Sequence, residues 1–143
     1  MQWEKDGNQY MIHVEKNEKI MEKLTQFCEE EKIENGFIYG IGAVKKIEIG
    51  AFDVEEKIYI HKEFSDTLEL TSYHGNITLK DGKPFIHAHI TLGNHNMELV
   101  GGHLFEATVS AVGEFQLQKL KFDASRKLNE DVGLPCICLS KKF

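Results

Sequence analysis

Arginine and long apolar runs are scarce in this sequence. Arg126 is the single arginine among 17 basic residues, although arginine makes the commonest specific contact to bases in the major groove. The net charge of −6 repels nucleic acid, and short lysine pairs such as Lys45-Lys46 are typical of a solvated surface. The composition therefore argues against a protein that reads DNA sequence by itself.

Apolar segments here are far shorter than the ~20 residues that a membrane-spanning helix requires. The first residues, Met1 to Asp6, lack the basic and then apolar pattern of a signal peptide. The cysteines Cys28, Cys136 and Cys138 are odd in number, so we expect reduced thiols rather than a disulfide framework. These absences predict a cytoplasmic protein without a membrane partner.

The chain has the length and composition of one globular domain. Its 143 residues are 41% hydrophobic and 28% charged, and a chain of this length can bury a core without disulfides or metal. No internal repeat, linker or low-complexity tract interrupts it. We therefore expect a single domain over residues 1–143.

Helical periodicity occurs once, and most of the remaining chain alternates as strands do. The helix is expected from Glu18 to Glu34, with Asn17 as its cap and Asn35-Gly36 at its end. Strands are expected over residues 9–14, 37–44, 46–52, 57–64, 67–77, 84–92, 97–104 and 106–120. Residues 122–134 have no clear pattern. The prediction is an α+β fold, a mainly antiparallel curved sheet with one early helix packed against it.

The expected strand over residues 84–92 carries the clearest chemical pattern. Alternate residues of a strand share a face, so His87 and His89 point one way, and the apolar residues between and beside them point to the core. Three imidazoles with a fourth position for water are the ligand set of a catalytic zinc site. A third histidine, His103, follows on the next expected strand. Histidines on a polar sheet surface are the alternative interpretation.

The hairpin between these two strands decides whether His103 can join the pair. A three-residue loop places His103 opposite His87. A loop of two or four residues turns His103 to the other face, unless a bulge at Gly101-Gly102 restores the register. The sequence allows the site without fixing the register.

Two carboxylates on expected strands are candidate catalytic groups. Glu114 lies within the strand over residues 106–120, and Glu69 lies between Leu68 and Leu70. A carboxylate near a metal-bound water can act as a general base or orient a ligating imidazole. Either residue can equally be a glutamate on the sheet surface. His74, beside Gly75, is a candidate pocket residue.

Several segments together resemble the PPC (plants-and-prokaryotes-conserved) domain of small bacterial and archaeal proteins. They are Gly40 to Val44, Leu68 to Leu70 with His74 to Ile77, the Pro84-x-x-His87-x-His89 motif, and Gly101 to Leu104. The resemblance extends from about residue 5 to residue 120, and the order of the segments is more specific than any single one.

The resemblance implies an antiparallel sheet with few helices and a homotrimer. It also implies a fold similar to that of acetolactate decarboxylase, a zinc enzyme whose metal is held by three histidines that include a His-x-His pair. Carried onto this sequence, those ligands are His87, His89 and His103, so Zn²⁺ or another divalent metal is the expected cofactor. Bacterial and archaeal members are often described as predicted DNA-binding proteins. That description derives from plant relatives, which carry AT-hooks. This sequence has no Arg-Gly-Arg-Pro hook.

Two functions are compatible with these residues. The first is a trimeric metal-binding protein that acts on or senses a small oxygen-rich metabolite, where the ion polarises a carbonyl or activates water and Glu114 or Glu69 assists. The second is a DNA-associated regulatory protein whose metal site is structural or vestigial. The acidic charge balance favours the first.

Overall fold

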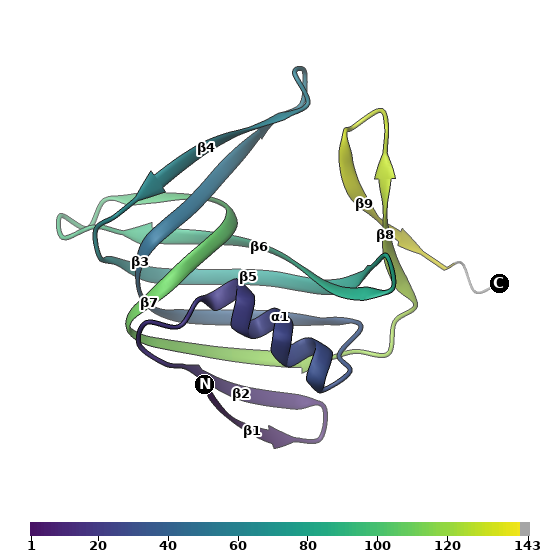
Figure 1. Cartoon of the computed structure of the whole chain (residues 1–143), viewed down its shortest axis with the longest axis horizontal. Helices are drawn as coiled ribbons and strands as arrows, with labels where there is room; N and C mark the ends of the chain where they lie inside the picture. Colours follow the sequence, from purple (N-terminus) through teal and green to yellow (C-terminus); the bar gives the residue numbers. More distant parts are fainter. Residues whose placement is uncertain (141–143) are drawn as a thin grey trace.

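The structure, a computed structural model, describes residues 1–140 as a nine-stranded sheet and one α-helix (Figure 1). The elements in chain order are β1 (Gln2–Asp6), β2 (Gln9–Val14), α1 (Ile20–Glu30), β3 (Gly36–Asp53), β4 (Ile58–Phe64), β5 (Leu68–Lys80), β6 (Lys83–Gly93), β7 (Leu99–Lys119), β8 (Ala124–Asn129) and β9 (Leu134–Leu139). Their pairings are antiparallel except that of β5 with β8. The α+β class is confirmed.

Two long strands determine how the sheet curves. β3 pairs with β5 along its first half and with β4 along its second half. β7 pairs with β6 near its start, with β2 near its end, and with β3 over most of its length. Because β6 also pairs with β5, the pairings β3–β5–β6–β7–β3 form a closed circuit. The sheet therefore has an inner face, turned to the core, and an outer face.

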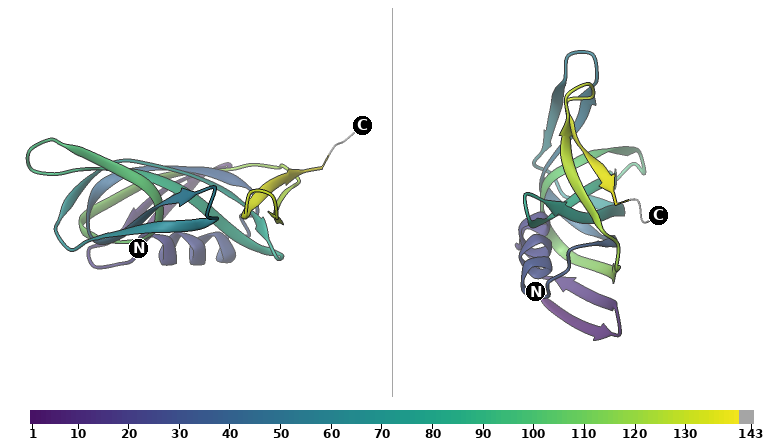
Figure 2. Two further views of the ribbon diagram at one scale, coloured as in Figure 1. Left: turned by 90° about the horizontal axis from the view of Figure 1, so that it is seen from above. Right: turned by 90° about the vertical axis from the view of Figure 1, so that its right-hand side faces the viewer.

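Helix α1 and the inner face form the hydrophobic core. Figure 2 shows α1 on one side of the sheet, and its expected apolar stripe is fully buried there: Ile20, Leu24, Phe27 and Cys28. Alternate residues of β2 and β6 complete the same core, as their period of two predicts. Among residues 1–140, no helix has the length and apolar character needed to cross a bilayer.

The helix begins later than expected, because its cap comes from a distant strand. The carboxylate of Glu106 in β7 accepts hydrogen bonds from the backbone N–H groups of Met21 at 2.9 Å and Glu22 at 3.2 Å. Asn17 does not cap the helix; its Oδ1 instead accepts a hydrogen bond from Lys45 at 2.8 Å. A carboxylate is favourable at this position because helix N-termini carry partial positive charge.

The helix also ends earlier than the expected Asn35-Gly36 pair. Lys32 adopts a φ of 52°, and the N–H of Ile33 donates to the carbonyl of Cys28 at 2.8 Å. This is a Schellman motif with lysine in the position that glycine usually occupies. The buried side chain of Ile33 then anchors the chain as it enters β3.

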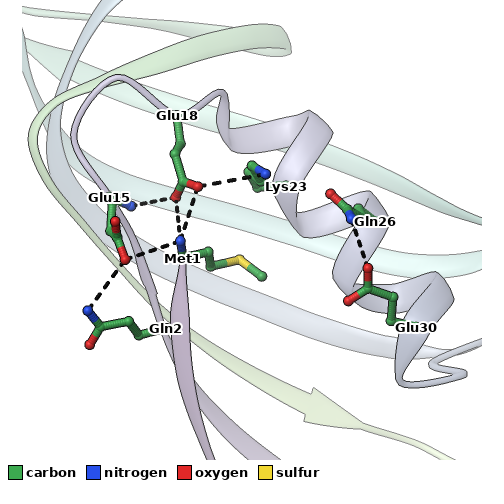
Figure 3. A network of polar contacts seen from close by, with 7 residues as sticks. All are labelled: Met1, Gln2, Glu15, Glu18, Lys23, Gln26 and Glu30. Atoms are coloured by element: carbon green, nitrogen blue, oxygen red, sulfur yellow. Dashed lines mark hydrogen bonds and ion pairs between the residues drawn. The ribbon is translucent and has the colours of Figure 1, made fainter.

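The segment before the helix is held by the carboxylate of Glu18 (Figure 3). It accepts hydrogen bonds from the amino group of Met1 at 3.0 Å and from the N–H of Glu15 at 2.8 Å. Lys23, one turn into the helix, lies 3.7 Å from the same carboxylate. These contacts connect the start of β1 to the loop that leads into α1.

Two hairpins extend from the sheet on the same side (Figure 1). One joins β3 to β4, and the other joins β8 to β9. Strand β8 lies within residues 122–134, which had no clear sequence pattern, and β9 begins at the last of them. Their tips touch: Lys57 Nζ donates to the carbonyl of Glu130 at 2.6 Å, and Gly133 packs against the Lys57 side chain. The two hairpins therefore form an arch at one end of the outer face.

Candidate metal centre

Three histidines meet on the outer face where β6 and β7 lie side by side. His89 pairs directly with His103, and His87 lies two residues along β6 on the same face. One nitrogen from each ring lies within 4.8 Å of the others. No other trio of His, Cys, Asp or Glu within residues 1–140 is arranged to share an ion. The structure thus brings the three predicted ligands together.

The hairpin register is none of those considered from the sequence, and the three histidines still share a face. His103 lies opposite His89 rather than His87, because the loop between β6 and β7 runs from residue 94 to residue 98 instead of spanning three residues. Asn94 holds this longer loop, since its Oδ1 accepts the N–H groups of Asn96 at 2.9 Å and Glu98 at 3.0 Å. Both loop lengths are odd, so both put His103 on the correct face.

Aromatic rings support His103 on the side of β3 and β4. Gly50 of β3 pairs with His103 on one side and with His61 of β4 on the other. Its missing side chain leaves room for Phe105, whose ring centroid lies 4.4 Å from that of His61 and 4.9 Å from that of His103. The ring of Tyr59 lies 5.0 Å from His103. These contacts restrict the orientation of the imidazole.

Burial keeps two of the three imidazoles neutral. It is the main cause that lowers the pKa of His87 to about 4, followed by the positive charges of Arg126 and His89. Burial is also the first cause that lowers the pKa of His103 to about 4, followed by the neighbouring histidines and Arg126. A neutral imidazole keeps a lone pair for a metal ion, so both side chains can ligate at neutral pH.

One nitrogen of His103 has no hydrogen-bond partner. Its Nδ1 is buried, and residues 1–140 offer it neither a donor nor an acceptor. Leaving such an atom unpaired costs roughly 1–3 kcal/mol, and an ion is one of the partners that resolve such cases. Imidazole nitrogens suit zinc and its neighbouring divalent metals. The donor set and the unpartnered nitrogen therefore fit a divalent metal ion.

Arg126 of β8 also reaches the histidines. Its Nη2 donates to Asn76 Oδ1 at 2.7 Å and lies 3.3 Å from Nδ1 of His87. Nothing in the sequence pattern points to this residue, because the contact joins positions 50 apart and depends on the pairing of β8 with β5. The one available signal is that it is the only arginine in a chain that otherwise uses lysine.

The two predicted carboxylates lie elsewhere on the outer face. Glu69 of β5 precedes His74, the partner of His89, by five positions, or about 16 Å along the strand. Glu114 pairs with Ile41 of β3, so three strand spacings, about 14 Å, separate it from β6. Within one chain neither carboxylate reaches the histidines, and their catalytic roles stay predictions.

Glu114 lines a groove of about 840 Å³ on the outer face of β2, β3, β5 and β7. His74 also lines this groove, as its place beside Gly75 suggested; its Nδ1 lies 2.8 Å from Ser72 Oγ. The groove adjoins the three histidines, because His74 pairs with His89 across β5 and β6. The outer face thus has a histidine end, around His87, His89 and His103, and a groove end.

Residues 1–121 match the model of the Plants and Prokaryotes Conserved (PCC) domain, which is the PPC domain named above. The chain belongs to this family. The matched segment contains all three histidines and ends before Arg126. No curated protein matches the chain.

Solved PCC-type structures share the fold over nearly the whole chain. A PPC protein of Pyrococcus horikoshii is 39% identical, with a TM-score of 0.86 over 96% of this chain and 93% of that one. A metal-containing protein of Archaeoglobus fulgidus is 35% identical, with a TM-score of 0.84 over 95% and 97%. A proposed DNA-binding protein of Bacteroides thetaiotaomicron is 31% identical, with a TM-score of 0.93 over 96% of each. The descriptions of the last two differ, since one names a metal and the other names DNA binding.

Proposed function

We propose that this PCC-domain protein holds one divalent metal ion, zinc by its donor set, between His87, His89 and His103, and binds or converts a small oxygen-rich metabolite there. The observation that carries the proposal is the convergence of three ligand nitrogens within 4.8 Å. The unpartnered Nδ1 of His103 and the low pKa values of His87 and His103 support it. The metal-containing relative from Archaeoglobus fulgidus supports it as well.

The chemistry follows from three protein ligands and an open position. A bound ion of this kind supplies Lewis acidity, which polarises a carbonyl or lowers the pKa of a water molecule. The chain itself sets the spacing of the imidazoles through the pairing of β6 with β7. Tyr59 and Phe105 contact the ring of His103 and restrict its orientation.

We further propose a homotrimer that associates through the groove end of the outer face. Apolar side chains of this groove are exposed to solvent in one chain: Met11 (54%), Tyr39 (48%), Ile41 (55%) and Val112 (44%). Clustered exposed apolar groups of this kind mark contact surfaces. Association there would be the means by which Glu114 or Glu69 of another copy assists at the histidines.

Elemental analysis of the purified protein tests the metal proposal. We expect about one zinc or similar divalent ion per chain, and His87→Ala, His89→Ala or His103→Ala should each abolish stoichiometric metal. His95→Ala is the matched control, because His95 is exposed in the loop between the same two strands. Full metal content in all three site variants would contradict the proposal.

A DNA-associated regulatory role is the second candidate, favoured by the description of the Bacteroides thetaiotaomicron relative. The charges of this chain oppose it: the net charge is −6, and the one arginine is buried beside the histidines. We expect no competitor-resistant binding to random or genomic duplexes at ~150 mM salt, because counterion release needs clustered Lys and Arg. Sub-micromolar binding in an anisotropy titration would reverse this order of the two candidates.

A further inference from the structure

Arg126 is a buried cation at the edge of the metal centre, only 8% exposed. Four of its five N–H groups have partners: Nε donates to Thr78 Oγ1 at 3.1 Å, Nη1 to the Pro135 carbonyl at 2.8 Å, and Nη2 to Asn76 Oδ1 at 2.7 Å, while Nη2 also faces His87 Nδ1 at 3.3 Å. This network fixes the guanidinium beside the histidines.

The described part of the chain gives this guanidinium no counter-charge. Its partners are neutral oxygens and one imidazole nitrogen, and none of the ion pairs within residues 1–140 includes Arg126. A buried charge is costly unless an opposite charge or a ligand compensates it. Arginine stays protonated at physiological pH, so it cannot relieve this cost by losing a proton.

His87 cannot serve Arg126 and a metal ion at the same time. A neutral imidazole has one lone pair, and the contact with Arg126 uses it at Nδ1. If His87 ligates through Nδ1, that lone pair is taken. If it ligates through Nε2, the proton moves to Nδ1, which then no longer accepts. A ligating His87 therefore leaves an N–H of Arg126 without its acceptor, next to a second positive charge.

We infer that Arg126 is the anion-recognising residue of this site and that the ligand is a small metabolite with an oxyanion group, a carboxylate or a phosphate. The inference rests on the proposed metal function. An oxyanion supplies what the described residues lack: acceptors for the free N–H groups and negative charge between two positive centres. Charge-assisted hydrogen bonds from the planar guanidinium suit carboxylate and phosphate oxygens in particular.

Arg126 also has a structural role, because its contact with Pro135 holds β9 and its contacts with Asn76 and Thr78 hold β5. A purely structural arginine would affect the stability of the β8–β9 hairpin but not the affinity for anions. The two roles are therefore separable by binding measurements on folded variants.

The test is a calorimetric titration of zinc-loaded protein with pyruvate and, separately, with inorganic phosphate at constant ionic strength. We expect Arg126→Gln to bind the better of these two probes about tenfold more weakly or worse than wild type, as the loss of a charged hydrogen bond predicts. Lys127→Gln, which removes the same charge from the exposed neighbouring residue, should bind like wild type. The better probe identifies the kind of oxyanion.

Three outcomes of the anion titration would overturn the inference: no binding of either probe to zinc-loaded wild type, equal affinity of wild type and Arg126→Gln, or an equal loss in Lys127→Gln. If Arg126→Gln does not fold, wild type alone gives the answer. Binding of anion and metal is reciprocal, so the better probe should raise the zinc affinity measured against a chromophoric chelator. An unchanged zinc affinity would also overturn the inference.

The metal content of wild type distinguishes a failure of the anion-recognition inference from a failure of the proposed metal function. A purified protein that never holds stoichiometric metal contradicts the proposed function and this inference with it. If the protein holds stoichiometric metal but its anion affinity does not depend on Arg126, only this inference is contradicted.

Discussion

The two ends of the outer face differ in how their side chains are supported. At the histidine end, the arch of the β3–β4 and β8–β9 hairpins brings Tyr59 and Arg126 to the ligands, and Phe105 fills the space above Gly50. At the groove end, apolar side chains such as Met11 and Ile41 stand exposed on β2 and β3. The first end restricts its side chains, and the second presents a surface.

The difference fits the two roles that we propose for one sheet. β3 and β7 run through both ends, so the fold supplies the same backbone to each. The two ends differ in the elements that cover them. Hairpins and aromatic rings hold the imidazoles where the proposed metal binding requires fixed geometry, whereas the proposed contact between copies requires only exposed apolar area. Glycines of β3 at either end allow a test of the two supports separately.

The largest expected effect is that of Gly42→Ala at the groove end. Gly42 lies at the irregularity in the pairing of β3 with β5, and a Cβ there would overlap the backbone carbonyl oxygen of Val112 in β7. Because a backbone atom cannot move aside alone, we expect a loss of about 3 kcal/mol or more in the free energy of unfolding, measured by chemical denaturation.

Gly93→Ala is the control for this variant. A Cβ at Gly93 would come closest to the methyl group of Thr71 at 3.3 Å, a contact that a side-chain rotation relieves, and would lie at ordinary van der Waals distance from Leu99 and Glu69. Equal denaturation midpoints for the Gly42 and Gly93 variants would show that the close approach of β3 and β7 contributes nothing to stability.

Gly50→Ala should have the next largest effect, and it should act on the histidine end. The added Cβ would lie 2.7 Å from Cε2 of Phe105, the ring that supports His103. We expect a loss of about 1–3 kcal/mol from overpacking, together with weaker zinc binding in a chelator competition. Adding Phe105→Leu should recover part of the stability, because it removes the clash. Wild-type zinc affinity in the single variant would argue against this support of His103.

Local patterns were enough to predict the histidine pair and the core. The period of two in β6 puts His87 and His89 opposite Ala88 whatever the rest of the fold does, and the helical stripe through Leu24 is buried as its spacing requires. The observed loop is longer than those considered from the sequence, and it still leaves His103 on the face of His87 and His89, because only the parity of the loop matters.

Features that depend on strand order could not be predicted in this way. The helix cap is Glu106, 85 positions from Met21, and the contact of Arg126 with Asn76 spans 50. Strand β1 is exposed along its whole length, so it shows no apolar alternation to find. The placement of Glu114 away from the histidines likewise follows from the order β7–β3–β5 and not from its own neighbours.

The pH dependence of stability should come from the histidine end, and per pH unit it should be smaller than the effect of Gly42→Ala. The pKa of His87 and of His103 is lowered to about 4 in the folded protein, against about 6.5 when unfolded. Between these values the unfolded chain binds more protons, so the metal-free protein loses stability as the pH falls from about 6.5 to 4. The slope approaches about 1.4 kcal/mol per pH unit for each histidine.

Denaturant titrations of metal-free protein across this range measure the slope. A variant with both His87→Gln and His103→Gln should lose the histidine contribution to the slope of stability against pH. The contribution of the carboxylates should remain. If wild type and the double variant have parallel curves, the two imidazoles are not held neutral by burial.

The smallest change in folding stability is expected for Ile41→Glu at the groove end, although its effect on assembly should be complete. Ile41 is 55% exposed and pairs with Glu114, so a glutamate there meets solvent in one chain, and the free energy of unfolding should stay within about 0.5 kcal/mol of wild type. In a trimer formed through the groove, the same glutamate would be buried without a partner beside a second carboxylate, which disfavours association.

Light scattering at micromolar concentration should therefore give a trimer for wild type and a monomer for the variant. Val54→Glu, at an equally exposed apolar residue outside the groove, should remain trimeric. A monomeric wild type would contradict the trimer itself, and a trimeric Ile41→Glu would place the contact between copies away from the groove.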